Sequence, residues 1–239
     1  MTYNIRHGKG MDGKVDLGRT ARTISSARPD LVGLQEVDHL IPRSRMQKQA
    51  NLLAQRLRMR HVFGPTISLC LGRYGNALLS RYPILSHRNH RLPGAGERRG
   101  FLEVRLRVMD QDLYVFNTHL GLNNKDRRRQ VVKILQVAGR CPGPVLLIGD
   151  FNARPGSAEL VPLTPTFIDT AAAAGAPRPT FPANAPLYRI DYIFASPHWE
   201  ITASATLDSQ ASDHLPVHTR LTHFVRCTKL RSTFNKPAI

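Results

Sequence analysis

VLLIGDFNARP, residues 145–155, joins an apolar run to an abruptly polar end. Residues 145–149 have the composition of a strand that is buried on both faces, and Asp150 and Asn152 follow closely. Because side chains alternate along a strand, the Asp150 carboxylate and the Asn152 carboxamide can point to the same side. The pair suits a functional site. It also suits an ordinary turn, since Asp, Asn, Pro and Gly are turn-forming residues.

The same plan, an apolar strand that ends in polar side chains, recurs along the chain. The other polar residues at such ends are Asn4, Glu36, His119, Asp191 and the pair Asp213-His214. Acidic residues are scarce, 17 among 239, yet they stand at several of these positions. If the ends meet at one edge of a sheet, the carboxylates repel one another unless a cation neutralises them. Hard oxygen ligands of this kind suit Mg²⁺ or Mn²⁺.

Strand patterns outnumber helical patterns in this sequence. The expected helices are residues 16–27 with Asp16 as N-cap, 45–57 with Met46 on the buried face, 124–138, and a short one within 164–170. The expected strands are residues 2–5, 31–37, 61–63, 76–80, 83–92, 101–108, 112–120, 145–149, 189–196, 201–207 and 215–222. This order favours two packed sheets flanked by helices. We expect one domain over residues 1–223 and a basic, loosely ordered tail over residues 224–239.

The charge balance is strongly basic. Lys and Arg total 34 against 17 Asp and Glu, which gives a formal net charge of +17, and Arg supplies 27 of the 34. Because the planar guanidinium matches phosphate oxygens, this surplus favours an anionic, phosphate-bearing partner. The alternative interpretation is that the charge is simply solvated.

Cysteine use and hydropathy bear on the compartment. Cys70, Cys141 and Cys227 show no zinc-binding spacing, so we expect ordinary thiols in a reducing compartment. There is no signal-peptide pattern and no apolar run long enough for a bilayer, which favours a soluble, cytoplasmic protein, and we expect a monomer. The first strand is short and stands at the start of the sequence, so a longer natural start or a leader upstream stays open.

Seven motifs stand in one order between residues 2 and 221. They are TYNIRHG (2–8), LQEVD (34–38), GNALLSRYPI (75–84), NTHL (117–120), GDFNARP (149–155), DYIF (191–194) and SDHLPV (212–217). The set resembles the endonuclease/exonuclease/phosphatase superfamily, which includes DNase I, exonuclease III-type repair nucleases, sphingomyelinases and inositol polyphosphate 5-phosphatases. The resemblance implies a four-layer α/β/β/α sandwich with two mostly antiparallel sheets, and metal-dependent cleavage of a phosphoester.

The resemblance also implies which residues bind the metal. Glu36 resembles the principal Mg²⁺ ligand, and Asp213 resembles a second carboxylate on the metal side. Asn4 resembles a residue that positions the metal or the phosphate. The structural alternatives are a solvent-exposed strand end for Glu36 and a turn residue for Asn4.

The remaining motif residues match catalytic positions of the superfamily. Asp150 resembles the base or water-orienting residue, and Asn152 resembles a donor to a phosphate oxygen. His214 resembles the histidine that binds a phosphoryl oxygen, and Asp191 resembles the carboxylate that orients it and keeps it cationic. His119 occupies the position of a donor near the phosphate, with a satisfied core histidine as the alternative.

Nucleic acid is the first candidate substrate. The candidate cations for backbone phosphates are Arg43, Arg45, Arg98, Arg99 and the run of residues 125–129, although that run also fits a solvated helix face. Asn76 either supports the phosphate or caps a strand. A lipid-headgroup phosphodiester is the second candidate, because a basic surface also suits an anionic membrane. Small phosphomonoesters come third, and a catalytically inactive phosphate-binding module is the least favoured.

Overall fold

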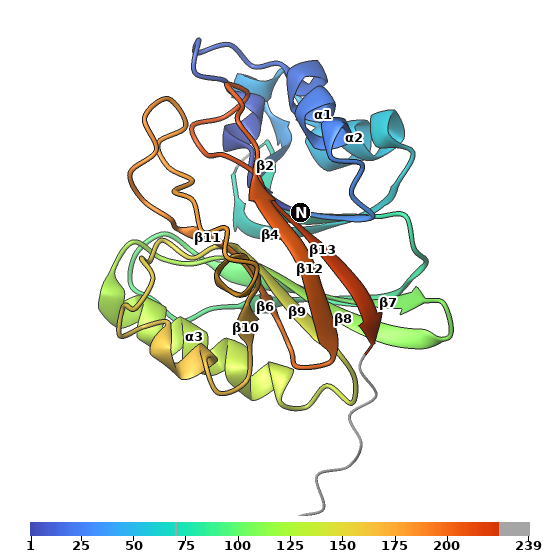
Figure 1. Ribbon diagram of the computed structural model, residues 1–239. Helices are drawn as coiled ribbons and strands as arrows, with labels where there is room; N and C mark the ends of the chain where they lie inside the picture. The colour runs from blue at the N-terminus through green and yellow to red at the C-terminus, as the bar shows by residue number, and fades with distance from the viewer. Residues whose placement is uncertain (70, 225–239) are drawn as a thin grey trace, which may run out of the picture.

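The computed structural model describes residues 1–69 and 71–224, and its two β-sheets pack face to face with helices on both outer sides (Figure 1). Helices α1 (Leu17–Ser26) and α2 (Gln49–Leu57) cover the first sheet, and α3 (Asn124–Ala138) covers the second. This arrangement confirms the predicted four-layer α/β/β/α sandwich. The predicted tail lies outside the described residues except for Phe224, and Cys70 lies outside them as well.

The first sheet has seven strands in the order β12-β13-β1-β2-β5-β4, with β3 paired to β2. Their bounds are β1 (Thr2–Asn4), β2 (Leu31–Ile41), β3 (Gln47–Lys48), β4 (Arg60–Ser68), β5 (Arg73–Ser80), β12 (Trp199–Thr206) and β13 (Val217–Phe224). β1 and β2 run parallel, and the other pairs are antiparallel. Since parallel strands point to the same edge, Asn4 comes beside Gln35, next to Glu36.

The second sheet has six strands in the order β10-β11-β9-β8-β7-β6. Their bounds are β6 (Ile84–Arg91), β7 (Gly100–Val108), β8 (Gln111–His119), β9 (Val145–Asp150), β10 (Ile168–Asp169) and β11 (Asp191–Ala195). β8 and β9 run parallel, so both finish at the same edge with His119 opposite Asp150. The short helix α4 (Thr170–Ala173) follows β10 directly.

Both faces of the central strands are buried, which explains why their sequences are apolar without alternation. In β8 and β9, Phe116 and Leu147 belong to an apolar cluster that also includes Val131 and Ile134 of α3. Their neighbours Val115 and Ile148 belong to the cluster between the two sheets. The opening stretch 145–149 is therefore covered by α3 on one side and by the first sheet on the other.

Buried amides connect the two sheets close to their polar edge. The Asn117 amide donates to the carbonyls of Leu34 (2.9 Å) and Ala77 (2.8 Å) of the first sheet, and its oxygen accepts from Gln35 at 2.6 Å. Asn76 donates across the same interface to the Gly100 carbonyl at 3.1 Å. Because unpaired polar groups are costly inside a core, these bonds favour one alignment of the sheets.

Of two predicted helices, one begins where it was expected and the other begins later. Helix α1 begins as expected, since the Asp16 carboxylate accepts from the backbone N–H groups of Gly18 and Arg19. The helix predicted from residue 45 begins only at Gln49. Arg45 and Met46 adopt left-handed backbone angles (φ 57° and 56°), which end the preceding turn, and the side chain of Met46 is exposed rather than buried.

The prediction of a short helix within residues 164–170 is wrong. Residues 168 and 169 form β10, which pairs with β11, and the helix α4 begins only at Thr170. Its N-cap is Asp169, whose carboxylate accepts from the N–H groups of Ala171 and Ala172. In the described part of the chain, no helix combines the length and the apolar character needed to cross a membrane.

Candidate active site

The polar strand ends of both sheets meet at one edge of the sandwich. In the second sheet, strand pairing sets Asp150 opposite His119 on one side and opposite Asp191 on the other. The first sheet contributes Asn4 at the end of β1, and the segment before β13 contributes His214. Residues that are as much as 210 positions apart in sequence thus share one cluster.

Asp150 is the centre of this cluster and is buried. Its Oδ2 accepts a hydrogen bond from Asn4 Nδ2 at 3.0 Å and lies 3.4 Å from His119 Nε2 and 3.7 Å from His214 Nε2. Its Oδ1 accepts the backbone N–H of Asn152 at 2.9 Å. These neighbours fix the direction of the carboxylate, as a residue that guides a water molecule requires.

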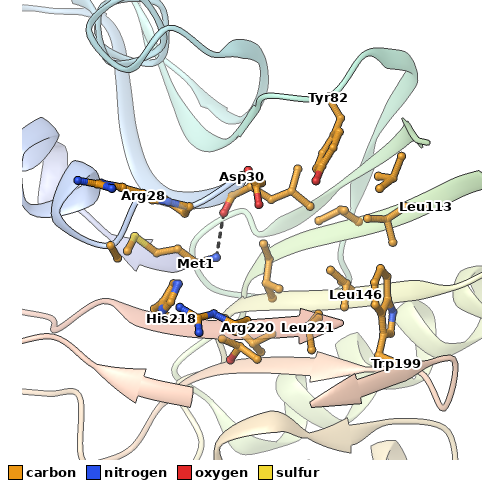
Figure 2. A pocket seen from close by; sticks show the side chains of 18 of the residues that line it. Met1, Arg28, Asp30, Tyr82, Leu113, Leu146, Trp199, His218, Arg220 and Leu221 are labelled. Atoms are coloured by element: carbon orange, nitrogen blue, oxygen red, sulfur yellow. Dashed lines mark hydrogen bonds between the residues drawn. The ribbon is translucent and has the colours of Figure 1, made fainter. Parts of the chain in front are cut away.

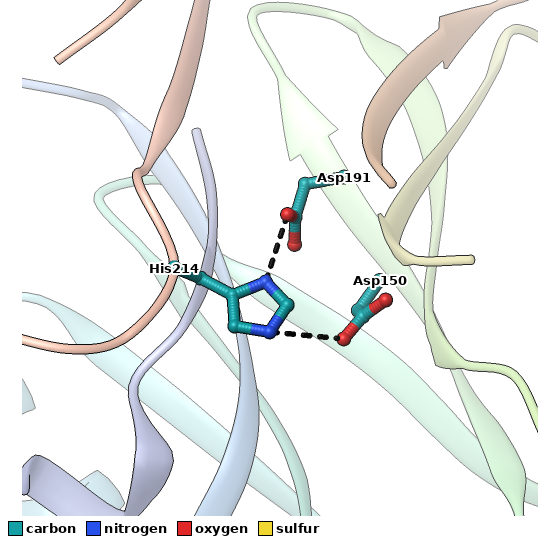
Figure 3. A group of neighbouring side chains, drawn as sticks. All are labelled: Asp150, Asp191 and His214. Carbon is teal, nitrogen blue, oxygen red and sulfur yellow. Dashed lines mark hydrogen bonds and ion pairs between the residues drawn. The ribbon is translucent and has the colours of Figure 1, made fainter. Parts of the chain in front are cut away.

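His214 lies between two carboxylates (Figure 3). Its Nδ1 is 2.9 Å from Asp191 Oδ2, and its Nε2 faces Asp150. Burial alone would lower the pKa of His214, but the charges of Asp191 and Asp150 outweigh burial and raise the pKa to about 10. The imidazole is therefore a cation at neutral pH, and Phe181 packs against it with ring centroids 4.8 Å apart.

His119 contacts the same carboxylate but has the opposite charge preference. Burial lowers its pKa to about 3, against the attraction of Asp150, and the nearby Arg99 and His214 lower it further. The ring is therefore neutral at physiological pH, with one donating and one accepting nitrogen. A neutral imidazole can donate one hydrogen bond to a phosphate oxygen without adding charge to the site.

Asn152 adopts a left-handed backbone conformation, φ 48°, which Asn tolerates better than most residues. This turn brings its N–H to Asp150, and its side-chain Nδ2 donates to the Leu120 carbonyl at 3.0 Å. An Asn amide has two N–H bonds, and the second has no acceptor among the described residues. The structure thus shows the turn at the end of the opening stretch, and it places the turn residue Asn152 next to Asp150.

Glu36 owes its position to an irregularity in β2. The register between β2 and β5 shifts between Leu34 and Val37, and Glu36 has a left-handed φ of 58°. A bulge of this kind re-aims a side chain out of the strand alternation. Its Oε1 accepts from Asn4 Nδ2 at 3.1 Å, so one amide touches both Glu36 and Asp150. Burial raises the pKa of Glu36, against the Asn4 hydrogen bond that lowers it.

Two subsets of these residues have donor atoms suited to a cation. Asp150, Asp191 and His214 offer three atoms within 4.8 Å of one another. However, a cationic His214 carries protons on both nitrogens and cannot coordinate a metal. The carboxylate of Glu36 is the better donor for a hard cation, since Mg²⁺ takes one or two carboxylates and keeps several waters. A cation there also relieves the repulsion between Glu36 and Asp150. The Asn4 amide directs its nitrogen to Glu36, and its oxygen accepts the Arg6 N–H at 3.1 Å.

Asp213 is half-buried beside this set. Its Oδ2 lies 3.2 Å from Arg6 Nε, and its Oδ1 lies 3.3 Å from the Ser212 hydroxyl oxygen. The same hydroxyl donates to the Asn4 carbonyl at 2.8 Å. Asp213 therefore lies near Asn4 as expected, but in this structure its charge is balanced by Arg6.

The predicted substrate-binding residues differ in their surroundings. Arg99 is only 9% exposed, its Nε has no hydrogen-bond partner among the described residues, and a guanidinium nitrogen lies 3.4 Å from Glu97. Arg98 is exposed. Asn76 is buried, and its amide is engaged with the Gly100 carbonyl, so it acts between the sheets.

The arginines of the basic run, residues 125–129, differ in their exposure to solvent. Arg127 does not extend to solvent, because its guanidinium pairs with the buried Glu159 and donates to the carbonyls of Gly121 and Leu122. Arg128 and Arg129 are exposed on α3. The prediction that the whole run can contact phosphates is therefore wrong for Arg127.

Sequence reasoning missed Arg6, Tyr74 and Phe181 around the cluster, and it named Arg43 only as a candidate contact for backbone phosphates. Arg6 stands two positions after Asn4, a spacing that could have indicated it. The Arg43 guanidinium lies 5.4 Å from the ring centre of Tyr74, and both side chains interact electrostatically with Glu36. Phe181 packs against His214 from the loop between α4 and β11. No local pattern links Arg43, Tyr74 and Phe181 to the site, since only the fold brings them there.

Comparison with known proteins gives the family of this chain. A sequence model of the endonuclease/exonuclease/phosphatase family matches residues 1–214. The chain belongs to this family. It is 32% identical over 157 residues to the uncharacterized protein YbhP of Escherichia coli K12 and to YbhP of Shigella flexneri. The match covers 63% of this chain and 62% of YbhP, so the chain spans less than two thirds of those relatives.

Solved structures of the family share the fold over most of the chain. An endonuclease/exonuclease/phosphatase from Beutenbergia cavernae is 28% identical with a TM-score of 0.80, over 93% of this chain and 70% of that one. A mannosyl-6-phosphatase from Bacteroides thetaiotaomicron is 20% identical with a TM-score of 0.76, over 92% and 98% of the two chains. A humanized D. rerio TDP2 is 22% identical with a TM-score of 0.72, over 92% and 97%. The last two likenesses concern the fold alone.

Proposed function

We propose that this protein is a Mg²⁺-dependent phosphodiesterase that hydrolyses a phosphodiester by in-line attack of water, with nucleic acid as its substrate. The main support for the proposal is the set of side chains that surround the Asp150 carboxylate. One carboxylate is held between a neutral His119, a cationic His214 and the Asn4 amide that also holds Glu36. This arrangement joins a water-guiding base, phosphate donors and a carboxylate for a cation within one cluster.

The residues have distinct tasks in this proposal. Asp150 accepts a proton from the attacking water, since its carboxylate is fixed at a rigid strand end. His119, His214 and the free N–H of Asn152 hold the non-bridging phosphate oxygens, and the positive charge of His214 stabilises the charge that develops on them. Asp191 keeps His214 protonated and oriented. Glu36 and Asn4 hold Mg²⁺, with Asp213 nearby, and the ion supplies polarisation of a phosphoryl oxygen and stabilisation of the leaving alkoxide.

The wall of the site beside Glu36 favours nucleic acid over other phosphodiesters. The Arg43 guanidinium lies over the ring of Tyr74, and the mostly buried Arg99 lies near both Tyr74 and His119. An aromatic ring with arginines suits stacked bases and backbone phosphates. The net charge of +17 supports attraction of a polyanion. A binding module without catalysis has no need for the full cluster at Asp150.

A substrate panel tests this proposal. Supercoiled plasmid, single-stranded DNA, RNA, sphingomyelin, bis-p-nitrophenyl phosphate and inositol phosphates are incubated with Mg²⁺, Mn²⁺ or EDTA. We expect turnover of a nucleic acid that Asp150→Asn reduces at least 100-fold, whereas Asp208→Asn, at an exposed carboxylate, retains full activity. Turnover of no phosphoester, or equal activity of both variants, would refute hydrolysis at this site.

Salt dependence separates nucleic acid from the other substrates. Contacts with backbone phosphates release counterions, so affinity for DNA should fall steeply with salt, and Arg99→Gln should reduce the slope of log K against log salt by about 1. The control is Arg140→Gln, an exposed residue in the turn between α3 and the start of β9. An unchanged slope in Arg99→Gln would remove this residue from the substrate contacts.

A further inference from the structure

A cleft of about 1090 Å³ lies between the two sheets, at the end of β1 that is remote from Asn4 (Figure 2). Its lining includes Met1, Leu146 and Leu221, and none of the residues that surround Asp150. Nothing in the structure shows what would fill this apolar space. A binding feature whose chemistry is more specific lies just past the other end of β2, at Arg43.

Arg43 is half-exposed, yet its guanidinium is held in a fixed direction. It belongs to the 3-10 turn Pro42–Ser44 directly after β2, and its Nε and Nη2 donate to the two Asp38 oxygens at 2.9 and 2.8 Å. The Asp38 side chain is fully buried, while 47% of the Arg43 side chain is exposed. Because two parallel hydrogen bonds fix the plane of a guanidinium, the exposed part of Arg43 has a defined orientation.

The ring of Tyr74 and the helix α2 support the same pair. Tyr74 lies opposite Asp38 in the pairing of β2 with β5, so the two side chains leave the same face of the sheet. The ring centre of Tyr74 is 5.4 Å from the Arg43 guanidinium. The Gln49 side chain, at the start of α2, accepts the Asp38 backbone N–H at 2.9 Å. The position of Arg43 therefore depends on several elements and not only on its own turn.

The Arg43 guanidinium keeps hydrogen-bond donors that Asp38 does not use. A guanidinium has five N–H bonds, and the pair with Asp38 occupies one on Nε and one on Nη2. The N–H bonds on Nη1 and the second one on Nη2 have no acceptor among the described residues. The simpler explanation, that Arg43 only neutralises Asp38, does not account for these donors. Their planar arrangement matches the oxygens of a phosphate.

Arg43 lies on the side of the site that has the Glu36 carboxylate. Both Arg43 and Tyr74 interact electrostatically with Glu36. Arg99, from the loop before β7 of the second sheet, interacts with Tyr74 and with His119. Its Nε is buried and has no hydrogen-bond partner in the described part of the chain. Tyr74 therefore has a guanidinium from each side of the sandwich near it, next to the catalytic cluster.

We propose that Arg43 binds a second phosphate group of the substrate, adjacent to the phosphate that is hydrolysed. The preferred substrate is then a phosphodiester with a neighbouring phosphate, as within a nucleotide chain, rather than one with a single phosphate. Asp38 is a positioning residue, since it orients Arg43 without touching the substrate. The proposal rests on the proposed function, because the hydrolysed phosphate has to bind at Asp150 for its neighbour to bind at Arg43.

Binding of small nucleotides tests this subsite without hydrolysis. Thymidine 5′-monophosphate, thymidine 3′-monophosphate and thymidine 3′,5′-bisphosphate are titrated into the protein with Mg²⁺ by calorimetry. We expect the parent to bind the bisphosphate about 10-fold more tightly than either monophosphate, as hydrogen bonds to a charged group imply. Arg43→Gln should bring this ratio to about 1. Arg73→Gln should keep the ratio, because Arg73 is exposed on the opposite face of β5 from Tyr74.

A double variant keeps the test valid if Arg43→Gln does not fold. That substitution leaves the buried Asp38 carboxylate unpaired, which is destabilising. Asp38→Asn/Arg43→Gln removes both charges, and it should also bind the three nucleotides with equal affinity. Equal affinity of the parent for the three nucleotides would overturn the proposal, and so would a preference for the bisphosphate that persists in the double variant.

Hydrolysis distinguishes failure of this proposal from failure of the proposed function. The substrates are the dinucleotide TpT and its phosphorylated form pTpTp, which has a phosphate on each side of the hydrolysed one. In Arg43→Gln, kcat/KM should fall about 10-fold more on pTpTp than on TpT. An equal loss on both would contradict the selectivity assigned to Arg43. A bisphosphate preference in a protein that hydrolyses neither dinucleotide would support the phosphate subsite and refute the proposed function.

Discussion

His214 and His119 contact the same carboxylate, Asp150, yet their pKa values move in opposite directions. His214 has a second carboxylate, Asp191, at 2.9 Å, and its pKa rises to about 10. His119 has Arg99 nearby instead, and burial lowers its pKa to about 3. One charged and one neutral donor can thus bind the same phosphate, and the difference depends on Asp191.

Asp191→Asn tests this dependence at the residue scale. Without the second negative charge, burial opposes only the remaining acidic neighbours, and the pKa of His214 should fall from about 10 to below 7, so the cation is lost near neutral pH. Turnover should drop about 100-fold or more, with the larger effect on kcat, because the charge acts on the transition state. The pKa is followed by NMR of the imidazole, and the rate by hydrolysis of the best substrate from the panel.

The control for this variant is Asp208→Asn, which removes an exposed carboxylate paired with Arg178. It should leave both the His214 titration and the rate unchanged. If Asp191→Asn lowered the rate while His214 stayed cationic, Asp191 would act by position rather than by charge. If neither changed, the assignment of the pair would be wrong.

At the scale of elements, the end of β9 depends on a close approach to β8. Gly149 has φ 149°, and a Cβ on it would lie 2.0 Å from the Thr118 carbonyl oxygen. Gly149→Ala should therefore cost about 2–4 kcal/mol of unfolding free energy through a backbone shift. The shift should also displace the adjacent Asp150 and lower turnover. Urea unfolding measures the first effect, and the hydrolysis rate measures the second.

Gly96→Ala is the matched control for this substitution. A Cβ at Gly96 meets no atom within 4 Å, so its unfolding free energy should stay within about 0.5 kcal/mol of the parent. Equal stability of the two variants would show that β8 and β9 can separate at Gly149 without cost, contrary to the packing described.

The elements that sequence predicted well are those whose signals are local. The cap at Asp16 and the amphipathic helix α3 depend on neighbours three or four residues away, and both were predicted correctly. Met46 was placed wrongly because hydrophobic spacing contains no information on the left-handed turn before α2. The bulge at Glu36 was not predicted either, since it results from register against β5.

At the scale of the whole molecule, a buried histidine, His119, and a half-buried one, His7, contribute to how stability responds to acid. His119 and His7 have pKa values lowered to about 3 and about 4 by burial, against an ordinary value of 6.5. Below pH 6.5 the unfolded chain binds protons that the folded chain does not, so stability falls as pH falls. His214 has the opposite sign, because its contribution is complete below pH 6.5 and is lost as pH rises through 10.

The lowered pKa of His119 predicts how His119→Gln changes the dependence of stability on pH. The parent should lose about 1.4 kcal/mol per pH unit below pH 6 on account of His119 alone, and the variant should lack that part of the slope. Urea unfolding between pH 4.5 and 7.5 measures the slope, with the exposed His87→Gln as control. Parallel slopes for all three proteins would show that His119 is protonated in the folded state.

The composition of the site could be predicted from the sequence, but its geometry could not. Each polar strand end was visible as a motif, and the shared order of the motifs indicated that the ends act together. The contact of Asn4 with Asp150, 146 residues away, depends on how two sheets align. Arg43 was a candidate phosphate contact, but no local pattern places it or Tyr74 near Glu36, because that arrangement arises only from packing.

Metal dependence of hydrolysis by Glu36→Gln tests the central claim most directly. Initial rates on the best nucleic-acid substrate are measured as Mg²⁺ is titrated into EDTA-treated protein, for the parent, Glu36→Gln and the control Glu200→Gln, at an exposed carboxylate of β12. We predict no turnover without metal, a requirement for about 10–100-fold more Mg²⁺ in Glu36→Gln, and an unchanged requirement in the control. Turnover that persists in EDTA, or the same Mg²⁺ dependence in Glu36→Gln as in the parent, would contradict a metal-dependent site at Glu36.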